Sequence, residues 1–202
     1  MTNFKNLFLR ALLALSILAA APAALAGPLY RVTLDTGASD WVGLSGYLDL
    51  SFGGYVGVGP AKATVTNLHG AFDESVEAYF ESLAGGNRAD GFTLVASENL
   101  SLVSQAVTFG GIFSFDLRFE EALAGLGADF GVSLVDSDFA PLTGDFPALT
   151  FFLVPGEETT MVGAELARVE VLPEGDVPEP SDWVLVATGL FLLGATRRLQ
   201  RR

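Results

Sequence analysis

The stretch Ile112-Phe-Ser-Phe-Asp-Leu-Arg-Phe-Glu120 indicates the fold class most clearly. Apolar residues occupy every second position from Phe113 to Phe119, and polar residues fill the positions between them and the final one. Successive side chains of a β-strand point to opposite faces, so this alternation predicts a strand with one buried face.

The same alternation recurs on both sides of this strand. In the segment 44–52, Leu44, Leu48, Leu50 and Phe52 share one face. Further strands are expected at 29–34, 61–68, 92–96, 105–109, 130–135, 149–154 and 165–172, separated by glycine- or proline-containing turn signals. Eight or nine closely spaced strands predict an all-β fold, an antiparallel β-sandwich of jelly-roll-like form. Only Asp73–Leu83 is expected to contain a helical turn or two.

Composition excludes several classes of function. None of the 202 residues is a cysteine, so disulfides, thiolate nucleophiles and cysteine metal sites are ruled out. There is one histidine, which makes most histidine-based metal or proton-relay sites improbable. The segment 27–180 carries five basic and 23 acidic residues, a net charge of −18. Because nucleic-acid binding needs a basic surface, no nucleic-acid partner is expected.

The N-terminus has the pattern of a secretory signal peptide over residues 1–26. Lys5 and Arg10 precede an apolar run at 11–21, and Ala24-Leu-Ala26 lies directly before Gly27. A basic segment, a short apolar segment and small residues at this spacing predict export through the Sec route and cleavage by signal peptidase between Ala26 and Gly27.

The C-terminus carries a second targeting pattern. An acidic, proline-rich tether at 173–182 precedes an apolar run at 183–196, which predicts a single transmembrane helix, although the run is short for one. A basic tail at 197–202 follows, in which Arg197, Arg198, Arg201 and Arg202 would hold the end of the chain in the cytoplasm. This order places the expected β-sandwich domain, 27–172, outside the cytoplasm.

The tripartite tail resembles the PEP-CTERM sorting signal of Gram-negative bacteria. The resemblance rests on Pro178, Glu179 and Pro180, the apolar run and the terminal arginines. It implies that the membrane enzyme exosortase recognises and removes the tail, and that the mature protein reaches the cell surface or the exopolysaccharide matrix. The alternative is a permanent anchor, in which Pro-Glu-Pro is only a linker and the domain is a binding protein that faces the periplasm.

The exported part also resembles a group of small PEP-CTERM proteins of unassigned activity. The matching stretches are 29–36, 46–52, 63–66, 113–117 and 130–138. All of them are strand-like, so the resemblance implies a shared fold and no particular reaction.

One motif suggests an enzyme. Leu34-Asp35-Thr36-Gly37-Ala38-Ser39 resembles the Asp-Thr-Gly element of aspartic proteases, in which two carboxylates share a proton. The chain has no second such element, although a homodimer would supply one, and Met161-Val162-Gly163 faintly resembles a later element of the retroviral enzymes. The alternative is that Asp35 ends a strand and begins a turn.

The other candidate residues are acidic or aromatic. Asp136 and Asp138, with Asp129 and Asp145, are weak candidates for a Ca²⁺ site, and solvated turn acids are the alternative. His69 is a single histidine after a strand, for which a structural role is the simpler interpretation. Three aromatic residues could stack on sugar rings or fill the core: Trp41, Tyr47 and Tyr55.

Together these patterns predict a non-enzymatic, exported surface or matrix protein with a structural, adhesive or polysaccharide-associated role. Its expected partners are signal peptidase, exosortase, the membrane through the C-terminal segment, and exopolysaccharide. The alternative function is a secreted hydrolase that uses Asp35.

Overall fold

A computed structural model describes residues 27–38, 40–120, 123–144 and 147–172. These residues form strands, turns and irregular segments without a helix, and the fold is all-β, as the sequence predicts. The signal peptide, the tether, the apolar C-terminal run and the terminal arginines lie outside the described residues. The described ranges therefore contain no helix with the length and hydropathy that a membrane crossing needs.

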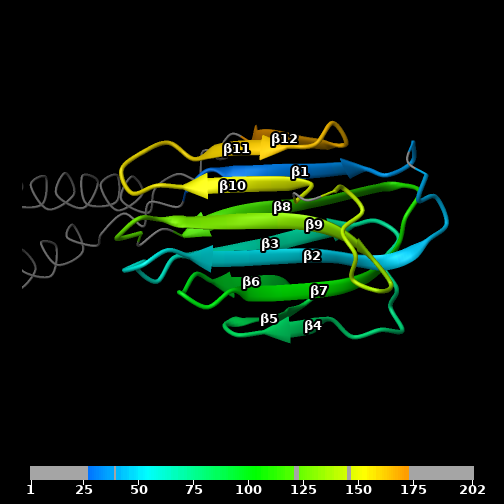
Figure 1. The fold of residues 1–202 in the computed structure, drawn as a ribbon, viewed down its shortest axis with the longest axis horizontal. Coiled ribbons are helices and arrows are strands. Elements are labelled where there is room, and N and C mark those ends of the chain that lie inside the picture. Colours follow the sequence, from blue (N-terminus) through cyan, green and yellow to red (C-terminus); the bar gives the residue numbers. More distant parts are fainter. Residues whose placement is uncertain (1–26, 39, 121–122, 145–146, 173–202) are drawn as a thin grey trace, which may run out of the picture. The chain divides into compact units, whose positions relative to one another are not determined.

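Within the described residues, twelve strands form two antiparallel sheets, seen as two layers in Figure 1. Sheet A has six strands, in the spatial order β12 (Ala167–Leu172), β1 (Leu29–Asp35), β8 (Ile112–Glu120), β3 (Lys62–His69), β6 (Gly91–Val95) and β5 (Ala84–Asn87). Sheet B has the order β11 (Thr160–Gly163), β10 (Leu149–Leu153), β9 (Ala128–Asp136), β2 (Ser45–Gly54), β7 (Ser101–Thr108) and β4 (Tyr79–Glu81).

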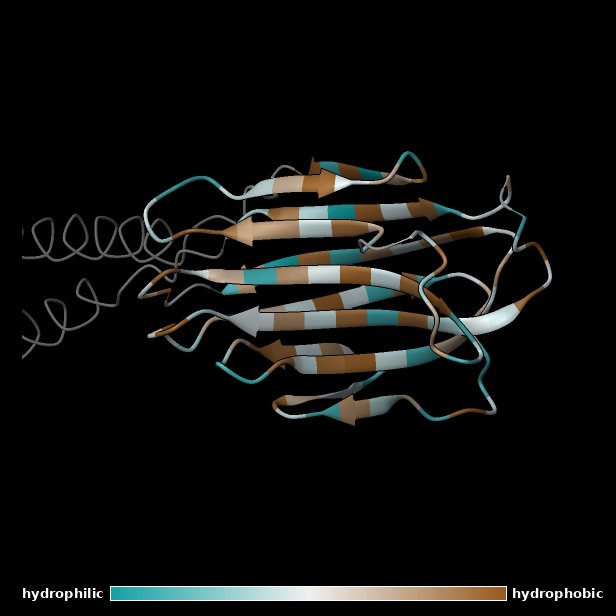
Figure 2. Cartoon of the chain, in the orientation of Figure 1, coloured by the Kyte–Doolittle hydropathy of each residue, from teal (hydrophilic) through white to brown (hydrophobic). Residues whose placement is uncertain are grey.

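The two sheets enclose a single core that is rich in phenylalanine. Phe119 of sheet A lies with its ring centroid 5.9 Å from that of Phe52, 5.7 Å from Phe130 and 5.6 Å from Phe151, all three in sheet B. Figure 2 shows the underlying pattern as hydrophobic and hydrophilic bands that alternate along the strands. Burial of one face of each sheet therefore holds the layers together as a sandwich.

The strand β8 coincides with the segment in which the alternation is clearest. The four apolar side chains of its alternating series, Phe113, Phe115, Leu117 and Phe119, are at most 1% exposed, as predicted, whereas Ile112 at its start is exposed. Asp116 is the exception, because it belongs to the polar series and yet is only 3% exposed. The ion pair described below explains its burial.

The sequence prediction fails at the short edge strands. The expected helical turn within Asp73–Leu83 is wrong, because this segment contains turns and strand β4. Gly85-Gly86-Asn87 is one of the glycine-containing segments expected to form turns between strands, but it lies in β5, and the sequence did not indicate β11. Leu44 is outside β2 and 48% exposed, so it does not share the buried face of that strand.

The first and last strands are neighbours. Leu29 pairs with Leu172 and Leu34 with Ala167, so β12 ends beside the point where β1 begins. Figure 1 shows both of these strand ends at the same end of the sandwich.

Candidate functional site

The most distinctive polar surface is the outer face of sheet B along its interior strand β2. Leu48, Leu50 and Phe52 of this strand are buried in the core. The alternate residues Tyr47, Asp49, Ser51 and Gly53 point outward, about 7 Å apart from one to the next along the strand. We call these four residues the β2 row.

An aromatic pair stands at one end of the β2 row. The rings of Tyr47 and Phe139 are stacked, with their centroids 4.7 Å apart and their planes 8° from parallel. Phe139 comes from the connection between β9 and β10, which folds across the front of sheet B in Figure 1. The stacked rings lie on a connection that backbone hydrogen bonds also hold against β9, among them Leu142 N to Leu134 O at 2.9 Å.

Phe139 is held in an unfavourable backbone conformation. Its φ of 62° is left-handed, which costs about 1–2 kcal/mol for a residue with a Cβ atom. The carboxylate of Asp136 stabilises the turn, because Oδ1 accepts hydrogen bonds from the backbone N–H groups of Asp138 and Ala140, each at 2.9 Å. The Phe139 side chain nevertheless remains 60% exposed.

A carboxylate and a hydroxyl group lie next along the β2 row. Ser104 Oγ of β7 donates a hydrogen bond of 2.6 Å to Asp49 Oδ1. Burial raises the pKa of the Asp49 carboxyl, and the hydrogen bond from Ser104 opposes that effect. Ser104 is buried, at 3% exposed, so it orients the partly exposed Asp49 carboxylate and leaves that carboxylate as the group that faces the solvent.

The acidic residues considered for Ca²⁺ do not converge. Asp129 and Asp136 lie near opposite ends of β9, about 23 Å apart along the strand. Asp136 stabilises its own turn, and Asp129 accepts a hydrogen bond from the Tyr55 hydroxyl, which raises the pKa of Tyr55. Asp145 lies outside the described residues, and within those that are described no three acidic or histidine side chains form a metal-binding group.

Positive charge is confined to the other side of the sandwich. All five Lys and Arg residues of the described part belong to sheet A or to its β5–β6 turn: Arg31, Lys62, Arg88, Arg118 and Arg168. Sheet B contributes Asp49, Glu81, Asp129 and Asp136 and no base. The outer face of sheet B is therefore negative.

A partly buried ion pair lies on the outer face of sheet A. Arg31 Nε and Nη2 donate to Asp116 Oδ1 and Oδ2 at 2.9 and 3.1 Å, and Asn67 Nδ2 donates to Oδ2 at 2.7 Å. Asn67 has a φ of 53°, at a register shift of β3 between Thr66 and His69. The ion pair with Arg31 lowers the pKa of Asp116, and burial opposes this.

Two shallow hollows adjoin this ion pair. The first, of about 340 Å³, is lined by Arg31, Asp116, Asn67, His69 and Ser114 among others. The second, of about 410 Å³, shares Asn67 and His69 and extends to Phe72 and Arg88. The single histidine thus lines both hollows.

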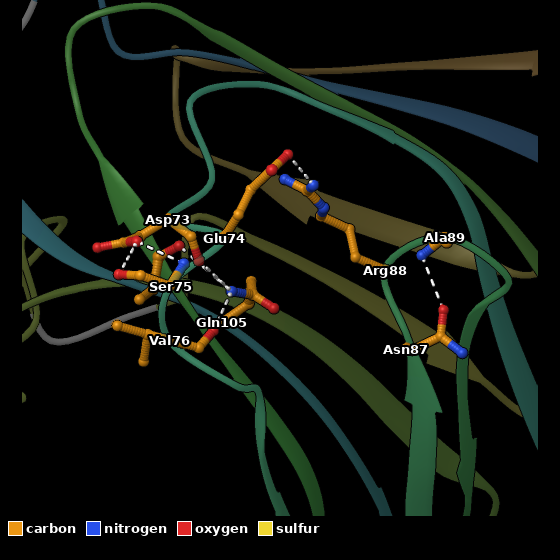
Figure 3. Close-up of polar contacts among 9 residues, drawn as sticks. Asp73, Glu74, Ser75, Val76, Asn87, Arg88, Ala89 and Gln105 are labelled. Carbon is orange, nitrogen blue, oxygen red and sulfur yellow. Dashed lines mark hydrogen bonds and ion pairs between the residues drawn. The ribbon is translucent and has the colours of Figure 1, made fainter.

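The second hollow is bordered by a loop that side chains hold in place. Figure 3 shows Glu74 and Arg88 reaching toward each other as an ion pair, and Arg88 also lies 5.6 Å from the centre of the Phe72 ring. Gln105 Nε2 donates long hydrogen bonds to the carbonyl groups of Asp73 and Val76. Each cation that lines the hollows thus has an acidic partner, so neither hollow has a free positive charge that would attract an anion.

The Asp35-Thr36-Gly37 motif forms a turn that closes the end of β1. Asp35 Oδ1 accepts a hydrogen bond from Gly37 N at 2.9 Å. Thr36 is fully buried, and its Oγ1 donates to Gly111 O at 2.8 Å and accepts from Gly110 N at 2.9 Å. Met161-Val162-Gly163 lies in β11 of the other sheet.

The three aromatic candidates differ in their surroundings. Tyr47 and Tyr55 lie on the surface of sheet B, whereas Trp41 is partly buried and packs edge-on against Phe109 of the core. The sequence reasoning missed Phe139, Ser104 and the partnership of Arg31 with Asp116. Phe139 directly follows the turn residues Asp136-Ser-Asp138, and a large aromatic next to this polar turn is the local signal that could have indicated it.

Comparison of the chain with protein-family models, with curated proteins and with solved structures finds no match.

Proposed function

We propose that this chain is an exported, exosortase-sorted protein of the cell surface or extracellular matrix, with a structural, adhesive or polysaccharide-associated role. The observation that supports this most directly is the pairing of Leu29 with Leu172. Because these residues begin the first strand and end the last, both proposed targeting segments join the sandwich at one end.

This arrangement is compatible with the removal of both segments. Cleavage at Gly27 and near the Pro178-Glu179-Pro180 motif cuts the chain outside every described strand. The core, which contains no disulfide, loses no contact between strands. The faces of both sheets and the loops at the far end stay available to a polymer in the matrix.

We further propose that the sandwich is of the jelly-roll type. The order β1-β8-β3-β6 in one sheet and the order β2-β7-β4 in the other support this. They correspond to one long antiparallel ribbon folded over itself, in which β3 pairs with β6, β2 with β7 and β1 with β8.

Intact mass and cell fractionation test the sorting proposal in a host strain with exosortase and in one without it. We expect the host form to lack residues 1–26 and the residues after the Pro-Glu-Pro motif, and the second cut to depend on exosortase. A mature form that keeps residues 183–202 in the normal host would show a permanent anchor and overturn the proposal.

A further inference from the structure

Phe139 is placed on the surface in a way that folding alone does not explain. A left-handed backbone favours Gly or Asn, and an exposed position favours a polar side chain. Phe139 meets neither preference, and its ring is 60% exposed beside Tyr47. Backbone strain of this kind is typical of functional sites.

The surface beside this aromatic pair offers hydrogen-bonding groups of low bulk. Asp49 and Ser104 are already aligned by their 2.6 Å hydrogen bond. Farther along, Ser51 faces Gly131 of β9, where an added Cβ atom would lie 2.7 Å from Ser51 Oγ. The outer face therefore carries little side-chain bulk here. Ser104 is buried, at 3% exposed, whereas the Asp49 carboxylate is partly exposed and can accept hydrogen bonds from a partner that is rich in hydroxyl groups.

The charge of this face restricts the partner. Sheet B contributes four acidic residues and no base within the described part of the chain. A polyanion would be repelled by this field, whereas a neutral chain would not be. A carboxylate accepts hydrogen bonds from hydroxyl groups, and an exposed aromatic ring packs on the apolar face of a sugar ring.

We propose that the stacked pair Tyr47–Phe139 and the adjoining β2 row form a binding site for a neutral pyranose polysaccharide. This inference rests on the proposed polysaccharide-associated role and adds its ligand class. A sugar ring packs against Phe139, and the Asp49 carboxylate, which Ser104 holds in place, accepts hydrogen bonds from hydroxyl groups of the same polymer.

Affinity electrophoresis of the full chain in a non-ionic detergent tests the site. The gels contain hydroxyethylcellulose, galactomannan or dextran as neutral probes, or alginate as an acidic probe. We expect retardation by at least one neutral polymer and none by alginate. Phe139→Asn should weaken the association about tenfold, and Asp49→Asn severalfold.

The Phe139→Asn change separates binding from folding. Asn accepts the left-handed conformation, so the thermal midpoint should stay close to that of the unchanged chain. Ile112→Asn is the matched control, because Ile112 is also 60% exposed but lies in β8 of sheet A. It should leave retardation unchanged.

Three results would overturn the inference. They are no retardation by any of the neutral polymers, equal retardation of the Phe139→Asn variant, or stronger retardation by alginate. The processing experiment above is independent of this test. A chain that is correctly sorted but is not retarded by any neutral polymer would therefore refute the binding site without affecting the sorting proposal.

Discussion

Arg31 and Asp116 form a two-point ion pair across β1 and β8, with Nε–Oδ1 and Nη2–Oδ2 distances of 2.9 and 3.1 Å. The Asp116 side chain is 4% exposed and that of Arg31 48%. The carboxylate is thus desolvated while the guanidinium partly contacts water. The pair, with the hydrogen bond from Asn67, explains how the Asp116 carboxylate can be buried on the outer face of sheet A.

We expect Asp116→Asn to lower the free energy of unfolding by about 1.5–3 kcal/mol at pH 7, because the hydrogen bonds to a charged group are lost. The folded-state pKa of Asp116 is lowered. The stabilisation by Asp116 is therefore present above its unfolded pKa of about 3.9 and is lost as the pH falls through the folded value.

Urea unfolding at several pH values checks this. The gap between Asp116→Asn and the unchanged chain should narrow as the pH falls below about 4. Glu120→Gln is the control, because the exposed Lys62–Glu120 pair should contribute less than about 1 kcal/mol. An equal loss in both variants would contradict the special role of the Arg31–Asp116 pair.

Thr36→Val should destabilise the fold by about 2–3 kcal/mol, because it removes the buried hydroxyl that Gly110 and Gly111 share. Thr36→Ser keeps the hydroxyl group and should recover most of the loss. Thermal unfolding of the two variants decides this, and equal midpoints for both would be the contrary result.

Asp35→Asn should change stability by less than about 0.5 kcal/mol, since the amide oxygen can still accept the bond from Gly37 N. The same variant addresses the hydrolase alternative. If the chain has a proteolytic activity with an acid optimum that this substitution abolishes, Asp35 is catalytic and the non-enzymatic interpretation is wrong.

Gly46→Ala should cost about 3 kcal/mol or prevent folding, because the new Cβ atom would lie 2.2 Å from Val135 O and 2.7 Å from Phe109 Cε2. Gly85→Ala is the matched control, since nothing lies within 4 Å of its added Cβ atom. Soluble yield and denaturant midpoints compare the two, and similar losses would contradict the close approach at Gly46.

Asp49→Asn should raise stability at neutral pH by less than about 1 kcal/mol. Burial raises the folded pKa of Asp49, so its ionised form penalises the fold above that pKa, and the penalty disappears below the unfolded pKa of about 3.9. The variant should therefore be more stable than the unchanged chain at pH 7, with the gain lost near pH 3. A loss of stability at pH 7 would show that the bond from Ser104 outweighs burial.

The sequence by itself determined the sandwich class and most of its longer strands. Ile112–Glu120 is a strand with the predicted bounds because its period-2 alternation spans nine residues without interruption. The short strands β4, β5 and β11 have only three or four residues each, too few for a period to be recognised. These short strands form because they hydrogen-bond to a neighbouring strand. The local sequence pattern does not show which segment will be that neighbour.

Tertiary structure alone decided which polar residues meet. Tyr47 and Phe139 are 92 residues apart in the chain, and Arg31 and Asp116 are 85 apart. Their contacts depend on the register of paired strands and on the path of one connection, while hydrophobic alternation specifies only which face each strand buries. The sequence could therefore indicate a sandwich, but only the assembled sheets show which polar and aromatic side chains meet on its surface.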